Sequence, residues 1–281
     1  MTICIISDGG ADLPTELAAE LGIRIVPLTV RFGDEVMPAD TGAQAFYNKM
    51  RESRELPKTA SPSPHDFAAA YRAAGPETDI LVLTISSALS STYQNAVIAR
   101  DMLLEDQPRN CGSIEVVDSL NASGGLGLLA YRAAKWAGTG MVFDELLQRV
   151  KSIVAESKLY VFLETLENVI KGGRLDRARG AVASMLNIKL VMKRSDEGTI
   201  EVVDKVRGSQ QAIRRMIERI GEVKHDFEKA VLAIAHSNCE EKARKVLADI
   251  LAVYPFRDVI FTDMGPVIGT YAGEGGILVS Y

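Results

Sequence analysis

Cysteine and histidine are scarce in this 281-residue chain, with three residues of each type. The cysteines are scattered and form no CxxC pair, so neither a disulfide framework nor a thiolate zinc site is expected. His65, His225 and His236 lie far apart, with no HExxH spacing. The sequence therefore predicts no metal site, although folding can bring distant ligands together.

Long apolar runs and an excess of positive charge are also missing. No apolar run reaches the roughly 20 residues that span a bilayer, and the first residues show no signal-peptide pattern. The chain has 32 Lys and Arg against 37 Asp and Glu, a formal charge of −5, whereas nucleic-acid-binding proteins usually present a basic surface. We expect a cytoplasmic protein that does not bind nucleic acid.

The first half of the chain alternates between strand and helix signals. Apolar runs typical of strands occupy residues 3–7, 23–32, 80–85 and 114–118. Helical segments are predicted between or after them, over residues 14–20, 43–52, 65–74 and 92–104. This alternation indicates βαβ units and a mainly parallel sheet, with ligands at the carboxyl ends of its strands.

The alternation resumes after two helices that are interrupted at Gly138 and Gly140. Strands are then predicted over residues 159–163, 185–193, 199–206, 230–235, 259–262 and 277–280, and helices over residues 166–170, 209–220 and 240–253. The sequence therefore predicts two α/β domains, residues 1–155 and residues 156–281.

Acidic residues follow two of the predicted strands. In the loop 7–14, Asp12 is placed to cap the next helix, or the small residues let the backbone approach an anion. Asp8 and Asp118 each end a strand. They either cap local backbone or pair across the sheet as metal-binding or acid–base carboxylates.

Hydroxyl side chains are concentrated in two other loops. One runs from Lys58 to Pro64 and is stiffened by two prolines, and a plain helix cap would account only for Ser63. The other places five hydroxyl residues within 86–92, just before a helix. Such a loop suits a carboxylate or phosphate. A serine nucleophile would need a base, and the GxSxG pattern is absent.

Glycine is concentrated in two further segments. Residues 265–276 contain five glycines, which weaken regular structure and permit close approach of a neighbouring strand or a ligand. Residues 171–174, KGGR, resemble a phosphate loop superficially, but the GxxxxGK[ST] spacing is missing.

Taken together, these motifs resemble the DegV family, the bacterial fatty-acid-binding proteins that carry the acyl group for fatty acid kinase. The resemblance runs in order along nearly the whole chain, through residues 7–14, 59–67, 85–96, 116–119, 123–126, 170–175, 206–208, 235–238 and 267–276. It implies two α/β domains with one long-chain fatty acid between them, and no cofactor.

The resemblance also implies the residues that bind the carboxylate. Two hydroxyls of the family's head-group site match Thr59 and Ser90, and the family's late histidine is replaced here by Tyr271. A phenol donates a hydrogen bond but is not cationic near neutral pH. Ser61 and Ser91 add hydroxyls where the family has Gln and Gly, so both are further candidates. Gly9 and Ala60 lack hydroxyls that the family has, and Glu274 replaces a proline.

In the family, a separate ATP-dependent kinase phosphorylates the bound carboxylate. The chain would then be a lipid-binding subunit without catalytic residues of its own. The arginine of the KGGR segment, Arg174 here, corresponds to the kinase-docking surface, or it lies in a solvated turn. Arg177 and Arg179 extend a basic patch that would attract an acidic partner or a membrane surface.

Two other functions stay open at this point: a lipid sensor or store that meets no kinase, and an acyl hydrolase or transferase that uses the 86–92 loop. The apolar tunnel wall is not assigned either. Its candidates, each of which also fits plain core, are Ile153, Val154, Val161, Phe162, Met185, Leu186, Ile188, Leu190 and Val191.

Overall fold

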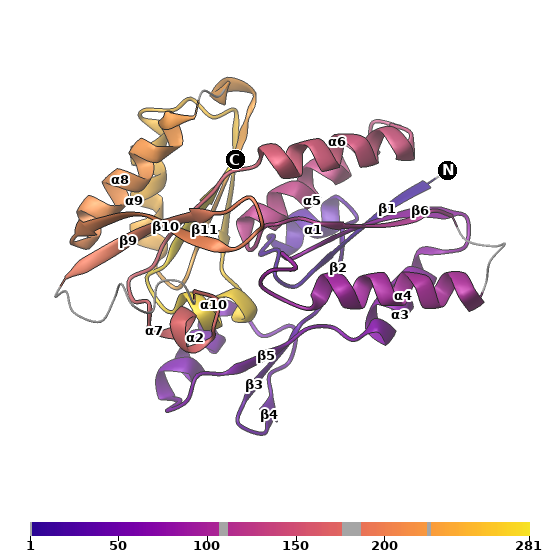
Figure 1. Cartoon of the computed structure of the whole chain (residues 1–281), viewed down its shortest axis with the longest axis horizontal. Coiled ribbons are helices and arrows are strands. Elements are labelled where there is room, and N and C mark those ends of the chain that lie inside the picture. Colours follow the sequence, from indigo (N-terminus) through magenta and orange to yellow (C-terminus); the bar gives the residue numbers. More distant parts are fainter. Residues whose placement is uncertain (1, 107–111, 176–186, 224–225) are drawn as a thin grey trace.

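The computed structural model describes residues 2–106, 112–175, 187–223 and 226–281 (Figure 1). The N-terminal half contains β1 (Thr2–Asp8), α1 (Thr15–Glu20), β2 (Arg24–Val26), β3 (Thr29–Phe32), β4 (Glu35–Val36), α2 (Ala43–Glu52), β5 (Lys58–Ala60), α3 (Pro64–Ala74), β6 (Thr78–Thr84), α4 (Thr92–Asp106), β7 (Ile114–Asp118), α5 (Gly124–Ala137) and α6 (Phe143–Glu156). The C-terminal half contains β8 (Leu159–Phe162), α7 (Glu167–Lys171), β9 (Ile188–Arg194), β10 (Ile200–Arg207), α8 (Ser209–Glu222), a 3-10 turn (Phe227–Lys229), β11 (Val231–His236), α9 (Glu240–Leu251), β12 (Asp258–Asp263), α10 (Pro266–Ala272) and β13 (Ile277–Ser280).

The first sheet is parallel, in the order β2-β1-β6-β7, as the sequence predicts. Alternate side chains of its strands face opposite helical layers. Ile6 and Val82 pack with α3 and α4, whereas Ile5 and Leu81 pack with α5 and α6. Because both faces are covered by helices, these strands read as continuous apolar runs.

The prediction of one strand over residues 23–32 is wrong. Residues Arg24–Val26 join the first sheet, and residues Thr29–Phe32 pair with β4 and β5 in a separate antiparallel sheet. The break falls at Pro27, which has no backbone N–H to continue a ladder. This small sheet was not predicted, and it carries Thr59.

The second sheet has six strands in the order β10-β9-β8-β13-β11-β12 and is mixed. One face packs against α8 and α9, through residues such as Met216 and Val246. The other face packs against α7, α10 and Met264. We call them the outer face and the inner face, because the inner one lies toward the N-terminal half (Figure 1).

Helix α5 joins the two halves, since its residues pack against both large sheets. Its glycines explain how it fits. A Cβ on Gly127 would collide with the carbonyl oxygen of Ala11, and one on Gly124 would meet the Ala233 side chain at 3.4 Å. Although α5 is mostly apolar, it has only 14 residues. Within the described ranges, no helix is long and apolar enough to cross a membrane.

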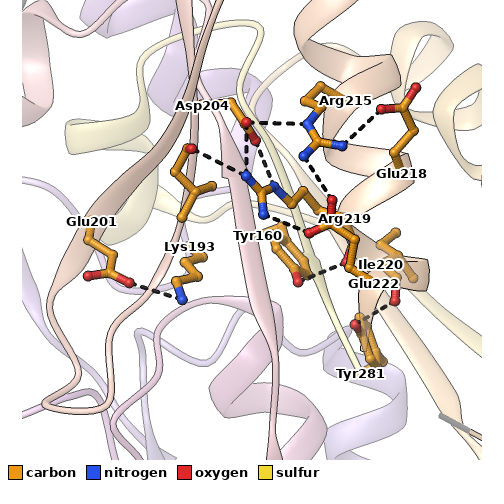
Figure 2. Close-up of polar contacts among 11 residues, drawn as sticks. Tyr160, Lys193, Glu201, Asp204, Arg215, Glu218, Arg219, Ile220, Glu222 and Tyr281 are labelled. Carbon is orange, nitrogen blue, oxygen red and sulfur yellow. Dashed lines mark hydrogen bonds and ion pairs between the residues drawn. The ribbon is translucent and has the colours of Figure 1, made fainter. Parts of the chain in front are cut away.

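The outer face also carries a network of ion pairs that ties α8 to β10 (Figure 2). Arg219 Nε lies 2.8 Å from the Asp204 carboxylate, and Arg215 Nε lies 3.2 Å from it. The phenols of Tyr160 and Tyr281 donate to the carbonyl oxygens of Arg219 and Ile220 (Figure 2). Polar bonding here fixes one helix against its sheet.

The glycine-rich segment 265–276 forms a helix, α10, that the composition did not predict. Pro266 begins it, where a missing N–H costs no hydrogen bond. Gly269 is needed for packing, because a Cβ there would lie 2.5 Å from the Tyr47 hydroxyl. At this glycine the close approach is therefore to an aromatic side chain of α2, whereas a Cβ on Gly276 would lie 2.9 Å from the Ser237 hydroxyl.

Candidate functional site

The five predicted head-group residues come from three segments that are distant in sequence. Thr59 lies on β5 with Ser61 just after it, Ser90 and Ser91 precede α4, and Tyr271 lies on α10. Thr59 Oγ1 is 2.5 Å from the Tyr271 hydroxyl. Ser61 Oγ is 2.9 Å from the hydroxyl oxygens of both Ser90 and Ser91. The fold thus links them in two hydrogen-bonded groups.

The loop that carries Ser61 is held in place just after this residue. Ser63 and Asp66 form a reciprocal capping box at the start of α3, which confirms a capping role for Ser63. Asn95 of α4 donates to the Pro62 carbonyl oxygen at 2.8 Å. Since Pro62 is itself conformationally restricted, the loop presents Ser61 toward α4 in a fixed geometry.

The hydroxyls of the 86–92 loop differ in depth. Thr92 is buried and lies 2.8 Å from Ser90 Oγ, whereas Ser91 is exposed. Ser86, also buried, donates to the Gly198 carbonyl oxygen in the turn between β9 and β10. The loop therefore both anchors the second sheet and leads from the interior to the surface.

Arg174 lies beside this cluster rather than in a fully solvated turn. Its guanidinium carbon is 4.7 Å from the centre of the Tyr271 ring, and its Nε donates to the Leu89 carbonyl oxygen at 3.3 Å. Gly172 makes the arrangement feasible, because a Cβ there would lie 2.5 Å from the Tyr271 ring. Arg177 and Arg179 lie outside the described residues.

A cavity opens between the two halves at this cluster. Its polar lining residues are Thr59, Ser90, Arg174 and Tyr271, and the rest are apolar: Leu28, Ile85, Leu89, Ala122, Leu159, Val161, Leu163, Val169, Met192, Ile200, Met264, Val267, Ile268, Ala272 and Leu278. Its open space is about 100 Å³. The cavity therefore has one polar, hydrogen-bonding end and a long apolar wall on the inner face.

Most of the apolar wall was not predicted. Of the candidate wall residues, Val161 lines the cavity, Phe162 packs on the outer face, and Met185 and Leu186 lie outside the described residues. The alternation of β8 separates these neighbours, because Leu159, Val161 and Leu163 share the inner side. That periodicity is visible in the sequence, but which side faces a cavity is not.

The carboxylates near the first sheet serve the backbone. Asp8, fully buried, accepts from the N–H groups of Gly10 and Ile85, and burial raises its pKa to about 6. Asp118 accepts from the N–H groups of Ser87 and Leu120. Capping of backbone N–H groups, some of them distant in sequence, rather than pairing of the two carboxylates across the sheet, accounts for both side chains.

Asp12 does not cap α1, whose N-cap position is Pro14. It bridges the two halves instead: its carboxylate accepts from Ser123 Oγ at 2.6 Å and from the Gly265 N–H at 2.8 Å. Burial raises the pKa of Asp12 to about 7, more than these hydrogen bonds lower it. The cap prediction is wrong because the backbone turns at Asp12, with φ 45°, before the helix begins.

The site shows no histidine arranged as a base, as far as the chain is described. His65 is exposed on α3, and the buried His236 lies 3.4 Å from Asp263. Within the described chain, the loop hydroxyls form hydrogen bonds with other hydroxyls and with backbone groups. Among the described residues, no group of three or more His, Cys, Asp or Glu side chains could hold a metal ion.

Comparison with known proteins agrees with this architecture. The chain is 31% identical to a DegV domain-containing protein of Streptococcus pyogenes serotype M3 over 285 aligned positions, which cover 100% of this chain and 99% of that protein. A DegV family protein of Ruminococcus gnavus with vaccenic acid superposes with a TM-score of 0.92 at 29% identity, over 100% of both chains.

Two further solved structures cover 100% of this chain and 99% of their own. One is a DegV family protein of Thermus thermophilus described by its fatty acid binding, with a TM-score of 0.90 and 27% identity. The other is the fatty acid kinase (Fak) B3 protein of Streptococcus pneumoniae loaded with linoleic acid, with a TM-score of 0.86 and 28% identity. The profile described as "Uncharacterised protein, DegV family" matches residues 2–281, and the chain therefore belongs to the DegV family.

Proposed function

We propose that this protein binds one long-chain fatty acid between its two halves and presents the carboxylate to a separate ATP-dependent fatty acid kinase. The observation that carries the proposal is the cavity, in which Thr59, Ser90 and Tyr271 form the polar end of an otherwise apolar space. An amphiphile with one small polar head and a long tail matches that distribution. Structural relatives with vaccenic and linoleic acid support the same ligand class.

The tail supplies most of the affinity. Burying each methylene contributes about 0.8 kcal/mol, so a long acyl chain gains more than ~10 kcal/mol before the costs of binding. A cavity of roughly 150 Å³ holds a benzene molecule, so the open space of about 100 Å³ must widen to accept such a chain. Met192 and Met264 line it, and methionine changes rotamer readily.

The head group sets the register of the tail. Hydroxyl donors at Thr59, Ser90 and Tyr271 would replace part of the hydration of the carboxylate. Ser61 and Ser91 extend this set toward the surface. Arg174, which lines the cavity beside Tyr271, brings a positive charge to the same end. Arg174 would thus contact both the head group and a docked kinase.

Presentation to a partner follows from the depth of the site. Ser91 is exposed while Thr92 is buried, so the polar end lies where the cavity approaches solvent. A kinase that supplies ATP and metal would reach the carboxylate there, while the tail stays buried. In this arrangement the protein positions one reactant and carries out no bond-making itself.

The first experiment is native mass spectrometry of the purified protein, followed by denaturing extraction of bound lipid. We expect about one long-chain fatty acid per chain. Thr59→Ala and Ser90→Ala should each weaken binding roughly 10- to 100-fold, because a hydrogen bond to a charged group contributes about 1.5–3 kcal/mol. Ser87→Ala is the matched control, since this exposed serine of the same loop does not line the cavity.

A protein that carries no lipid and takes up no added fatty acid would contradict the proposal. The kinase step has its own test. Arg174→Gln should lower acyl-phosphate formation by a partner kinase more than it lowers fatty acid binding. If both survive the change, the docking role is wrong. If fatty acid binds but is never phosphorylated, the protein is a lipid store or sensor, and turnover of an acyl ester without a partner would indicate a hydrolase.

A further inference from the structure

A polar cleft, separate from the fatty acid cavity, lies at the opposite end of α5 from that cavity. The amino end of α5 adjoins the first-sheet loops, where Ser123 N–H donates to the Gly10 carbonyl oxygen. Its carboxyl end, with α6, forms one wall of the cleft, and the segment before β11 forms another. These elements lie away from α7 and α10 (Figure 1). The cleft has a volume of about 600 Å³, within the usual range of small-molecule sites.

The cleft is lined by five cations, Arg132, Lys135, Arg149, Lys229 and Arg257, and by one carboxylate, Asp226. We call it the basic cleft. Asp226 is already paired with Lys229 at 2.6 Å. The whole chain has a formal charge of −5, so this concentration of positive charge is opposite to the balance of the protein. Such a cleft focuses the electric field and raises the local concentration of anions.

Within the described residues, four of these cations lack a charged partner. Arg132, Lys135, Arg149 and Arg257 form no ion pair with a residue that the structure describes. Two of them rest on aromatic rings: Arg149 lies 4.4 Å from the centre of the Trp136 ring, and Lys135 lies 5.8 Å from that of Tyr131. Stacking of this kind holds a side chain in place without neutralising its charge.

Arg132 is the most enclosed of the four and is partly buried. Burial lowers its pKa, and the positive charge of Arg257 lowers it further. Glu156 acts in the opposite sense but forms no ion pair with it within the described chain. The carboxyl end of α5 favours one nearby cation by about 0.3–1 kcal/mol, which accounts for Lys135 but not for a desolvated arginine beside another arginine.

We propose that the basic cleft binds a soluble phosphorylated small molecule, with its phosphate group held by Arg132 and Arg257. Two guanidinium groups offer forked N–H donors that match phosphate oxygens. A dianionic phosphate would neutralise the unpaired charge that otherwise destabilises this part of the fold. The concave shape and the partly buried Arg132 favour a small molecule over a flat membrane surface, which would meet mainly the exposed cations.

The test is calorimetric titration of the intact protein with inorganic pyrophosphate and with ATP at low ionic strength, where charge interactions are least screened. We expect both probes to bind. The double variant Arg132→Gln, Arg257→Gln should weaken binding by about tenfold or more, in line with the loss of two charge-assisted contacts. The control is Arg54→Gln with Lys151→Gln, which removes two exposed cations outside the cleft and should change affinity by less than about twofold.

Thermal unfolding separates a binding defect from a folding defect. Without added phosphate, Arg132→Gln should raise the unfolding midpoint, because it removes an unpaired and partly desolvated cation. Pyrophosphate should raise the midpoint of the unaltered protein and not that of Arg132→Gln. Arg257→Gln changes only an exposed side chain and provides a second variant that keeps the fold.

Three results would overturn the proposal. Pyrophosphate and ATP would both fail to bind, or both would bind equally well to the double variant. In the third, the protein would bind neither soluble probe but would bind vesicles of phosphatidylglycerol, and not of phosphatidylcholine, through these residues. That result would make the cleft a membrane contact. Fatty acid content is measured on the same samples and is expected to stay unchanged, so this test does not depend on the fatty acid proposal.

Discussion

The inner and outer faces of the six-stranded sheet are built from alternate residues of the same strands. On β8, Leu159 and Val161 face inward, and Tyr160 and Phe162 face outward. Both sets are apolar or aromatic and almost fully buried. The outer face is covered by the longer helices α8 and α9, whereas the inner face is covered in part by the short helices α7 and α10. A cavity arises where the covering elements are short, and hydrophobicity alone does not distinguish the faces.

The largest expected effect on fatty acid binding comes from filling the cavity on the inner face. Val161→Phe adds a ring to the cavity wall, and we expect bound fatty acid to fall by about tenfold or more, because extra volume in a packed site is poorly accommodated. Lipid extraction and mass spectrometry measure the loss.

Tyr160→Phe is the matched change on the outer face of the same strand. It removes only the hydroxyl that donates to the Arg219 carbonyl oxygen, so it should keep the fatty acid and lower the free energy of unfolding by about 1 kcal/mol. If both variants lose lipid equally, the division into two faces fails.

A somewhat smaller effect on fatty acid binding is expected from a change after α7, where Gly172 lies against the Tyr271 ring of the head-group site. Gly172→Ala puts a Cβ 2.5 Å from the Tyr271 ring. Moving the ring would break its contacts with Thr59 and Arg174, lower the free energy of unfolding by about 1–3 kcal/mol and weaken fatty acid binding. Denaturant unfolding and a binding titration measure the two effects.

Gly42→Ala is the control for that variant. A Cβ at Gly42 meets no atom within 4 Å, and its φ of −63° suits any residue. The free energy of unfolding of the Gly42→Ala variant should therefore stay within about 1 kcal/mol of that of the unaltered protein, or rise slightly. Equal losses in Gly172→Ala and Gly42→Ala would show that the ring contact is not the cause.

Asp12, the buried carboxylate between the two halves, should make the stability of the fold depend on pH. Asp12 has its pKa raised from 3.8 to about 7 by burial. The folded protein therefore binds more protons than the unfolded chain between these values, and stability should fall as the pH rises from about 4 to about 7. Asp12→Asn, which keeps the shape and tolerates the positive φ, should remove this part of the slope. Urea unfolding across that range tests it, and an unchanged slope would contradict the assignment.

Glu164, two residues after β8, should give a pH dependence of stability of the opposite sign. Its effect should be the smallest. Burial raises the pKa of Glu164, but the hydrogen bonds from Lys189, Lys242 and Ser209 outweigh burial and lower this pKa to about 2. Stability from this cluster is present above pH 4.5 and should be lost as the pH falls toward 2.

Because the Glu164 side chain is 39% exposed to solvent, screening limits its contribution to about 1 kcal/mol. Glu164→Gln should flatten the acid limb of the stability curve, as followed by urea unfolding between pH 5 and pH 2.5, roughly the interval in which its proton is taken up. A steeper acid limb in the variant would show that the lysines do not stabilise the ionised form.

Much of the fold could be predicted from periodicity. The parallel first sheet follows from short apolar runs separated by helices, and β11, α9 and β13 fall where their patterns place them. The failures have local causes. Pro27 divides one apolar run between two sheets, and α10 forms in spite of its glycine because Gly269 fits against Tyr47. In each case a tertiary contact outweighs the local preference of the sequence.

The kinds of groups available can be read from the sequence alone: two loops rich in hydroxyls, an arginine after two glycines, and strands with continuous apolar runs. The sequence also carried the family resemblance. The three-dimensional fold brings Thr59 to Tyr271, 212 positions away, and stacks Arg174 on the same ring. It likewise brings Arg132 and Arg257 into one cleft. Side-chain chemistry is local to each residue, but proximity depends on how the sheets and α5 pack, and packing involves the whole chain.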